Sequence, residues 1–159
     1  MEISAEKSKV LVNNISKQGP TNITLNGQVL EEVDSFKYLG SIITKDGRST
    51  KEIKTRLGTA TAAMTGLGII WKSTNIRLPV KIKLYKSLVI SILLYGCESW
   101  TLNAETERRI QAFENKCYRK LLGIHYSEHK TNQYVRQQID DAAGEKQQLL
   151  AIVKQRKLA

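Results

Sequence analysis

The sequence predicts an α+β fold, in which a small antiparallel β-sheet spanning roughly residues 7–44 is followed by a helical bundle. Short apolar runs between turn signals fill the first part of the chain, as is typical of strands. From residue 49 onward, apolar residues recur at steps of three and four, which places them on one face of a helix. We expect the sheet to be weakly stable alone, because so few strands bury little apolar surface.

Three segments are expected to form this sheet. Lys7–Asn13 has an apolar centre, and Asn26-Gly27 joins two short β-type runs, which is a strong signal for a two-residue hairpin. The third segment, Ser35–Thr44, is almost continuously apolar, so we expect contacts on both of its faces. The chain is therefore predicted to divide into a β region at 1–48, a helical domain at 49–140, and a linker with a C-terminal helix at 141–159.

The first helix is predicted to begin after Ser49. Ser49 and Glu52 form a Ser-x-x-Glu capping box, in which each side chain satisfies a backbone N–H that the first turn leaves unpaired. Glycine and threonine are frequent along this helix, and both are weak helix formers, so packing must stabilise it. Its predicted apolar face consists of Ile53, Leu57, Ala60, Met64, Leu67 and Trp71.

Two longer helices, a short helix that begins near Thr131-Asn132 and a last, basic helix are expected to follow. Pro79 suits the first turn of the second helix, because its missing N–H would lack a partner there in any case, and Gly96 is expected to end that helix. Asn103 is a good N-cap for the third helix and Gly123 a C-terminal stop, while Asp140–Gly144 is read as a linker. The predicted apolar faces are Ile82, Tyr85, Val89 and Ile92 in the second helix, widened by Leu84, Leu88 and Leu93, and Ile110, Phe113, Cys117 and Leu121 in the third.

Charge gives the first indication of a partner. The formal net charge is +10, and the stretch 53–97 contains no Asp or Glu. An acid-free pair of basic helices suits a polyanion such as nucleic acid, although a basic helix can also serve solubility alone. A second basic set, formed by Lys116, Arg119 and Lys120, is diluted by Glu114. The cations of the acid-free stretch are Lys54, Arg56, Lys72, Arg77, Lys81, Lys83 and Lys86.

Several other functions are disfavoured. Cys97 and Cys117 fit no zinc or redox spacing, so we expect buried thiols in a reducing compartment. We see no signal peptide, and the longest apolar run, Leu88–Cys97, is too short to span a bilayer, so we expect an intracellular protein, nuclear or cytoplasmic, without a membrane partner. His125–His129 spells the His-x-x-Glu-His motif of some zinc peptidases, but that chemistry needs both histidines on one helix face. We read the segment as a polar loop and expect no metal site and no small-molecule substrate.

Two segments resemble a known family. Phe36-Lys37-Tyr38-Leu39-Gly40-Ser41, followed by Leu94-Tyr95-Gly96-Cys97-Glu98-Ser99-Trp100, resembles the reverse transcriptases of non-LTR (LINE-type) retrotransposons, in the part after the catalytic centre. Ile3–Lys9, Phe113–Leu122 and Thr131-Asn132 match further family segments in the right order. The resemblance implies the end of a polymerase palm with its primer grip, then a thumb. The family continues past this sequence, so the last helix is expected to be truncated.

The resemblance also implies what is missing. The family's catalytic aspartates, which hold two Mg²⁺ ions, lie upstream of the matched region, and Mg²⁺ is therefore expected only for the complete parent enzyme. Asp140-Asp141 does not lie in a turn between two apolar strands, so we do not expect it to be catalytic. Lys7 falls on the family's lysine beside the active site, where its role would be vestigial; a plain surface lysine is an equally good interpretation. The fragment is therefore expected to be unable to polymerise nucleotides.

What remains implies contact with nucleic acid. Tyr38, Leu39, Gly40 and Ser41 fall on the family's primer grip, and the seven cations of 53–97 are candidate phosphate contacts of a thumb. The expected partners are an RNA–DNA or DNA duplex and the missing palm portion of the parent polymerase. A protein-interaction or non-functional remnant of a retrotransposon reading frame is the alternative. Among the aromatic residues, Trp71 and Tyr85 are expected to pack in the core, whereas Tyr95 and Trp100 can stack on bases.

Overall fold

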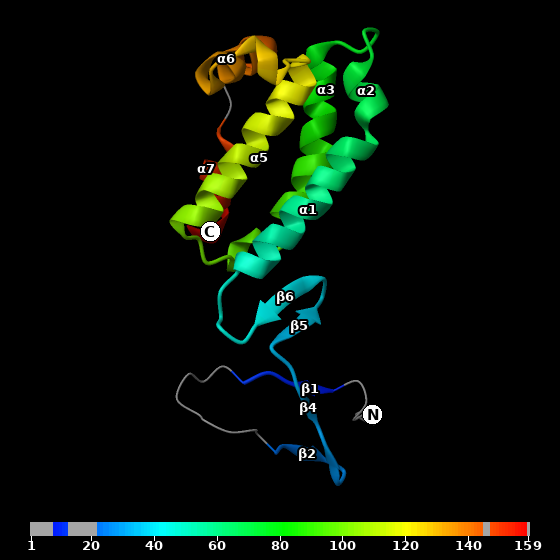
Figure 1. Cartoon of the computed structure of the whole chain (residues 1–159), viewed down its shortest axis with the longest axis vertical. Helices are drawn as coiled ribbons and strands as arrows, with labels where there is room; N and C mark the ends of the chain where they lie inside the picture. The colour runs from blue at the N-terminus through cyan, green and yellow to red at the C-terminus, as the bar shows by residue number, and fades with distance from the viewer. Residues whose placement is uncertain (1–7, 13–21, 145–146, 159) are drawn as a thin grey trace. The chain divides into compact units, whose positions relative to one another are not determined.

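The computed structural model describes residues 8–12, 22–144 and 147–158, which Figure 1 traces from blue to red. It divides into two compact units, residues 1–52 and 53–159. The first three residues of helix α1 belong to the first unit, and the helix continues into the second. The α+β character expected from the sequence is confirmed, because strand pairs occupy the first unit and helices the second.

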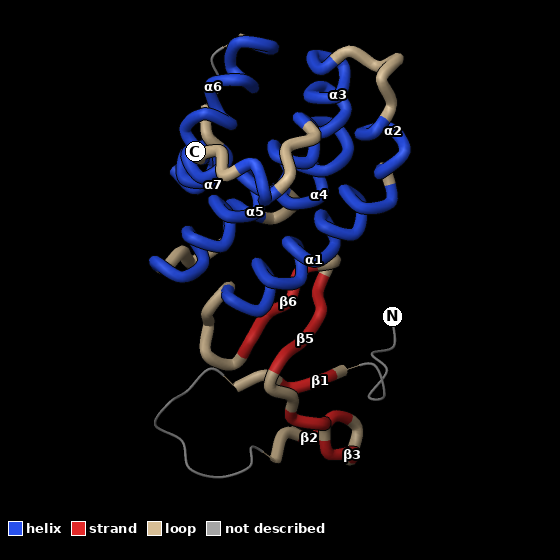
Figure 2. Tube along the Cα trace, turned by 45° about the horizontal axis from the view of Figure 1, so that its top comes forward, coloured by secondary structure: helices blue, strands red, loops and turns tan. Residues whose placement is uncertain are grey.

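The first unit contains three separate strand pairs where one antiparallel sheet was predicted (Figure 2). The prediction of a single sheet is wrong for the described residues, and one of the pairs is parallel. The physical reason is local for the two hairpins: one tight turn folds each of them back on itself, so their strands pair with each other and not with a common sheet. The pairs are β1 (Lys9–Val10) with β4 (Glu31–Glu32), parallel; β2 (Thr24–Leu25) with β3 (Gln28–Val29), antiparallel; and β5 (Ser35–Tyr38) with β6 (Ser41–Thr44), antiparallel.

Both hairpins turn through two residues with positive φ. The predicted hairpin at Asn26 and Gly27 is confirmed, with φ angles of 50° and 80°. The second turn uses Leu39 and Gly40, with φ angles of 47° and 85°. Positive φ at both central residues is the requirement of the type I′ turn, which matches the right-handed twist of the strands.

The first unit buries little apolar surface. Every fully buried hydrophobic side chain among the described residues lies at Ile53 or beyond. The expectation that Ser35–Thr44 is covered on both faces is wrong, because the segment is a hairpin that pairs with itself and leaves side chains in solvent. The large hydrophobic side chains that this unit exposes are Ile23, Val29, Tyr38, Leu39 and Ile43.

One buried acid joins β6 to the start of α1. The Glu52 side chain is buried, and its Oε2 accepts a hydrogen bond of 2.7 Å from the backbone N–H of Ile42. On the same first turn, Lys51 Nζ donates to Ser35 Oγ at 2.7 Å. These two bonds hold the β5–β6 hairpin against the helix start within the first unit.

The second unit is a helical bundle. Helix α1, the continuous helix formed by α3, η2 and α4, and helix α5 lie side by side, and α6 and α7 pack against α5 (Figures 1 and 2). The elements are α1 (Thr50–Gly66), α2 (Gly68–Lys72), α3 (Leu78–Leu84), η2 (Tyr85–Ile90), α4 (Ser91–Leu94), η3 (Cys97–Ser99), α5 (Ala104–Leu122), η4 (Tyr126–Glu128), α6 (Asn132–Ala143) and α7 (Leu149–Leu158).

The predicted apolar faces form the core of this bundle. In α1 and α2, Ile53, Ala60, Met64 and Trp71 are buried, with Leu57 and Leu67 packed against them. In α5, the predicted face is buried along its whole length. Helical periodicity therefore identified the core correctly, because packing, rather than intrinsic propensity, holds these helices together.

The second predicted helix differs in one respect. Its residues Tyr85–Ile90 form a π-helix, which has more residues per turn than an α-helix. The buried face consequently advances by one position. Leu93, which was predicted only to widen the face, is fully buried, and Ile92, which was predicted at its centre, is only partly buried. Leu88, predicted to widen the same face, is 42% exposed.

The predicted helix ends are mostly confirmed. Asn103 caps α5: its side chain accepts from Thr106 N–H at 2.8 Å, and Thr106 Oγ1 accepts from Asn103 N–H at 2.9 Å. Gly96 and Gly123 both adopt the left-handed conformation just beyond a helix end, which only glycine does without strain. Pro79 lies in the first turn of α3.

The predicted linker at Asp140–Gly144 is wrong. Helix α6 continues to Ala143, and Gly144, with φ of 78°, follows it. Gln137 Nε2 donates to Asp141 Oδ1 at 2.8 Å within this helix. Buried Val135 and Ile139 hold α6 to the bundle, so packing extends the helix through the two aspartates.

Two further findings concern the described ranges 8–12, 22–144 and 147–158. No helix there is long and apolar enough to cross a membrane. The same residues contain no cluster of three or more His, Cys, Asp or Glu side chains that could hold a metal ion.

Candidate nucleic-acid interface

The predicted primer-grip residues form the tip of the β5–β6 hairpin. Tyr38 ends β5, Leu39 and Gly40 make the turn, and Ser41 begins β6. Tyr38 and Leu39 are 58% and 75% exposed. A left-handed leucine costs roughly 1–2 kcal/mol, so an apolar side chain is presented to solvent on a strained turn. Lys7 lies outside the described residues.

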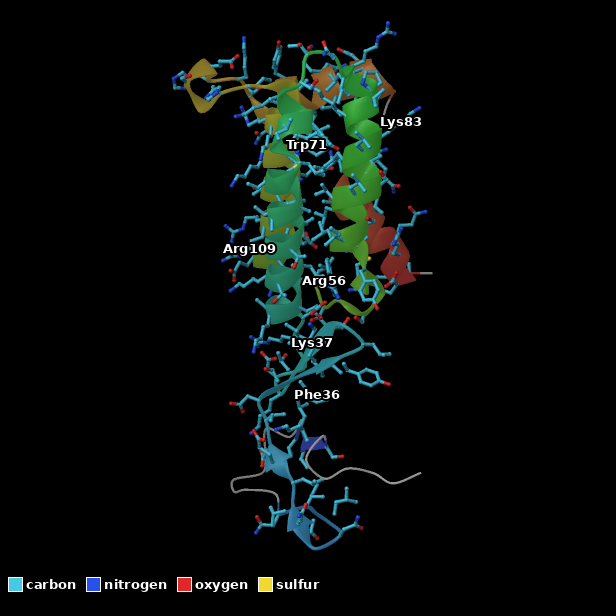
Figure 3. All side chains as sticks on the ribbon, turned by 90° about the vertical axis from the view of Figure 1, so that its right-hand side faces the viewer. Phe36, Lys37, Arg56, Trp71, Lys83 and Arg109 are labelled. Carbon is cyan, nitrogen blue, oxygen red and sulfur yellow. The ribbon has the colours of Figure 1, made fainter. Side chains whose placement is uncertain are left out.

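Four of the seven predicted cations are exposed around the α2–α3 corner. Lys72 ends α2 and Arg77 precedes α3, so the two flank the turn between these helices. Lys83 and Lys86 are exposed and three positions apart on the following helix, and Figure 3 labels Lys83. Residues three apart are neighbours on a helix surface, so these two ammonium groups share one face.

Two of the other three cations, Lys81 and Arg56, contact parts of the protein itself, and the exposed Lys54 acts on Glu105 through its charge. Lys81 is half-buried, and its Nζ donates at 2.7 Å to the backbone carbonyl of Trp71, at the end of α2. The guanidinium of Arg56, a residue labelled in Figure 3, lies 4.6 Å from the centre of the Tyr95 ring, which is a cation–π contact. Lys54 is close enough to Glu105 to help lower the pKa of that carboxyl, after the larger contribution of Arg109.

A second basic surface lies between α5 and α6, and the sequence did not predict it as a unit. It is an open groove of about 690 Å³. Four cationic side chains and no carboxylate line it, and none of the seven cations predicted from 53–97 does. We call it the α5–α6 groove; its lining residues are Arg108, Gln111, Ala112, Asn115, Lys116, Arg119, Asn132 and Arg136.

Hydrogen bonds fix two arginines of the α5–α6 groove. Arg136 Nε, on α6, donates to Asn115 Oδ1, on α5, at 3.2 Å. Arg119 Nη2 donates to the carbonyl of Lys130 at 2.7 Å and to Asn132 Oδ1 at 3.0 Å. The two guanidinium groups therefore bridge the walls of the groove and keep one orientation without an acidic partner.

Glu114, which was expected to dilute the second basic set, does not line this groove, although Arg136 lies close enough for its charge to act on the Glu114 carboxyl. Its side chain is buried on the opposite side of α5, where Oε1 accepts from Tyr118 Oη at 3.0 Å and from Leu149 N–H at 2.9 Å. Burial raises the pKa of the Glu114 carboxyl, against the lowering effect of these two hydrogen bonds and of the Arg136 charge. The helical spacing of Arg108, Ala112, Asn115 and Arg119 is the signal that could have separated the two faces.

Three of the four candidate aromatic side chains and both cysteines are buried. Trp71 and Tyr85 are buried, so their assignment to the core is confirmed. Trp100 is also buried, which removes it as a base-stacking candidate, whereas Tyr95 is 54% exposed. Both cysteines are free and buried, and burial raises the pKa of the Cys117 thiol to about 12.

The His-x-x-Glu-His segment has no metallopeptidase geometry. Its centre is the short 3₁₀ turn η4, and His129 has a positive φ of 48°. The Glu128 carboxylate accepts from the backbone N–H of His125 at 2.7 Å, as a turn-stabilising contact. The two histidines therefore do not share the face of one α-helix, which that motif requires.

Comparison with known proteins finds relatives among transposon products. The chain is 29% identical, over 99% of its length, to the uncharacterized transposon-derived protein F52C9.6 of Caenorhabditis elegans, and it spans 57% of that protein. It is 24% identical over 78% of its length to the probable RNA-directed DNA polymerase from transposon X-element of Drosophila melanogaster. It is 26% identical over 77% of its length to the RNA-directed DNA polymerase from mobile element jockey of Drosophila funebris. The chain spans 14% of each of these two polymerases.

No family model matches the chain, and no solved structure matches it. The similarity to two polymerases of LINE-type elements and to a transposon-derived protein supports a retrotransposon origin. The chain is thus distantly similar to retrotransposon reverse transcriptases.

Proposed function

We propose that this chain is the primer-grip and thumb portion of a retrotransposon reverse transcriptase, and that it holds a primer–template duplex through phosphate contacts. The observation that carries the proposal is the exposed basic corner of the helical unit. Lys72, Arg77, Lys83 and Lys86 come from a stretch without acidic residues and are exposed. Such contacts give affinity without base specificity, which suits a protein that must follow any template.

The β5–β6 hairpin has a separate role in this proposal. Its turn presents Tyr38 and Leu39 to solvent, and Gly40, which has no Cβ, lets the backbone approach a sugar-phosphate chain. The other exposed hydrophobic side chains of the first unit suit contact with the remaining palm of the parent polymerase. The proposed partners are therefore an RNA–DNA or DNA duplex and that palm portion.

Catalysis is not part of the proposed function. The parent polymerase uses Mg²⁺ held by aspartates, and the only adjacent aspartate pair here, Asp140-Asp141, lies on α6. We propose that the chain works inside the cell and without a small-molecule substrate.

A second candidate function is a protein-interaction remnant. The observation that favours it is the number of exposed hydrophobic side chains on the first unit, which suit a protein partner as well as they suit a palm. The two candidates differ in one property: only the first requires nucleic-acid binding by the basic corner.

Reversing two charges at this corner tests the proposal. In the double variant Lys83→Glu and Lys86→Glu, we expect affinity for a labelled RNA–DNA hybrid to fall by about tenfold or more at physiological salt. The slope of log affinity against log salt should become shallower by about two, because each lost phosphate contact releases one counterion fewer. Lys81 is left unchanged, since its bond to the Trp71 carbonyl supports the fold. Fluorescence anisotropy measures both quantities.

The matched control is the triple variant Gln148→Glu, Gln155→Glu and Lys157→Glu at α7, which changes the net charge equally at exposed positions. Lys154 is left unchanged, because its Nζ pairs with Glu107 Oε1 at 2.8 Å. The affinity of this control for the hybrid should stay within about threefold of the wild-type value. If net charge alone governed binding, the control would lose as much affinity as the double variant. Equal losses in the two folded variants would contradict a localised contact at the corner.

A further inference from the structure

We propose that the α5–α6 groove is a second nucleic-acid site, which binds the phosphate backbone of a single strand. It goes beyond the duplex contact proposed above and does not depend on it, because the two sites share no residue. The groove is lined by Arg108, Lys116, Arg119 and Arg136 and by the amide side chains of Gln111, Asn115 and Asn132.

No acidic side chain lines this groove. Glu114 is on the same helix but turned into the core. Arg109 and Glu105 pair with each other at 2.7 Å on another exposed part of α5, and neither lines the groove. Four positive charges therefore face one open cavity, which raises the local concentration of an anion.

Two of the groove arginines are held in place before any ligand arrives. The contact of Arg136 recorded above uses Nε, so its terminal Nη groups can bind a phosphate group. Arg119 is held by a backbone carbonyl and by Asn132 Oδ1. A fixed guanidinium loses less rotamer freedom when it binds a phosphate oxygen pair, which favours arginine at such sites.

The size and length of the groove favour one strand. From Arg108 to Arg119, α5 rises about 16 Å at about 1.5 Å per residue, which matches about five phosphates of a stacked strand at about 3.4 Å each. A volume of about 690 Å³ is that of a ligand pocket, so it takes part of one strand rather than a double helix. The amide groups offer hydrogen bonds to sugars. Since none of the lining residues is aromatic, base stacking and sequence preference are not expected.

The test uses a labelled oligouridine of about ten nucleotides and the RNA–DNA hybrid in parallel. The variant is Arg108→Glu with Lys116→Glu. Both side chains are exposed, and neither makes one of the bonds between α5 and α6 described above. We expect its affinity for oligouridine to fall by about tenfold or more, while its affinity for the hybrid changes by less than about threefold. The variant Lys83→Glu with Lys86→Glu should show the opposite pattern.

A second variant tests the arginine geometry. Arg119→Lys with Arg136→Lys retains both charges but removes the planar fork, and we expect about threefold to tenfold weaker oligouridine binding. The melting temperature should also fall, because the bonds that these arginines make between α5 and α6 are lost, so binding is compared at a temperature where both proteins are folded. Unchanged oligouridine affinity in the folded Arg108→Glu, Lys116→Glu variant overturns the proposal. Displacement of oligouridine by an oligoglutamate peptide at equal concentration of charge also overturns it, because the groove would then be a general anion site. Failure of the hybrid arm alone would count against the duplex contact and not against this groove.

Discussion

Replacing Trp71 with alanine should lower the free energy of unfolding by about 3–5 kcal/mol. Trp71 is 3% exposed and lies in the core next to α1 and α3, where Figure 3 labels it. Its Nε1 donates at 2.7 Å to the carbonyl of Met64, and its own carbonyl accepts from Lys81. The substitution therefore opens a cavity and leaves the Met64 carbonyl without its indole donor.

Chemical denaturation followed by far-ultraviolet circular dichroism measures this loss. The matched control is Ile69→Ala, also on α2, because Ile69 is 87% exposed and should change the stability by less than about 0.5 kcal/mol. A loss below about 1 kcal/mol for Trp71→Ala would show that α2 does not pack as described.

Removing the Glu114 carboxyl should cost about 1–3 kcal/mol when alanine replaces it and much less when glutamine does. The carboxylate joins α5 to the start of α7 by accepting from the Leu149 N–H and from the Tyr118 hydroxyl. Alanine leaves the buried N–H unsatisfied, whereas the glutamine carbonyl can still accept from it.

The same residue should impose a pH dependence on stability. Because burial raises the folded pKa of Glu114 above its usual value of 4.5, the folded state binds a proton more tightly than the unfolded state does. This contribution to stability is fully present below the unfolded pKa and is lost as the pH rises through the folded pKa. Glutamine does not titrate, so the Glu114→Gln variant lacks this pH-dependent contribution. The free energy of unfolding of the variant, relative to that of the wild type, should therefore increase as the pH rises from the unfolded pKa to the folded pKa of Glu114. Unfolding curves of both proteins at a series of pH values measure the difference, in which other titrating groups largely cancel. A constant difference in the free energy of unfolding between the two proteins across this pH range would contradict a raised pKa of Glu114.

The sequence predicted the helices well because their signals are local. Caps such as Asn103 and stops such as Gly123 act within one turn of a helix. The apolar residues from Ile53 to Trp71 recur every three or four positions, and this spacing alone identifies the buried face of the helix. The turn at Asn26-Gly27 was found for the same reason. Strand pairing was not, because the parallel partnership of Lys9 with Glu31 depends on chain segments far apart in sequence.

The candidate site was harder to predict, because it depends on how helices pack. The α5–α6 groove needs Arg136 beside Asn115, which are 21 positions apart. Glu114 counts as a surface charge in any window of the sequence, yet α7 covers it. The structural role of Lys81 likewise depends on the Trp71 carbonyl of a different helix.

The central claim is that the basic corner of the helical unit binds the backbone of a duplex. The most direct measurement is the affinity of the wild-type chain for a labelled RNA–DNA hybrid over a series of salt concentrations. With Lys72, Arg77, Lys83 and Lys86 as phosphate contacts, we predict a log–log slope of about −3 to −4. A slope near zero, or no binding at low salt by a chain whose circular dichroism shows it to be folded, would contradict the claim.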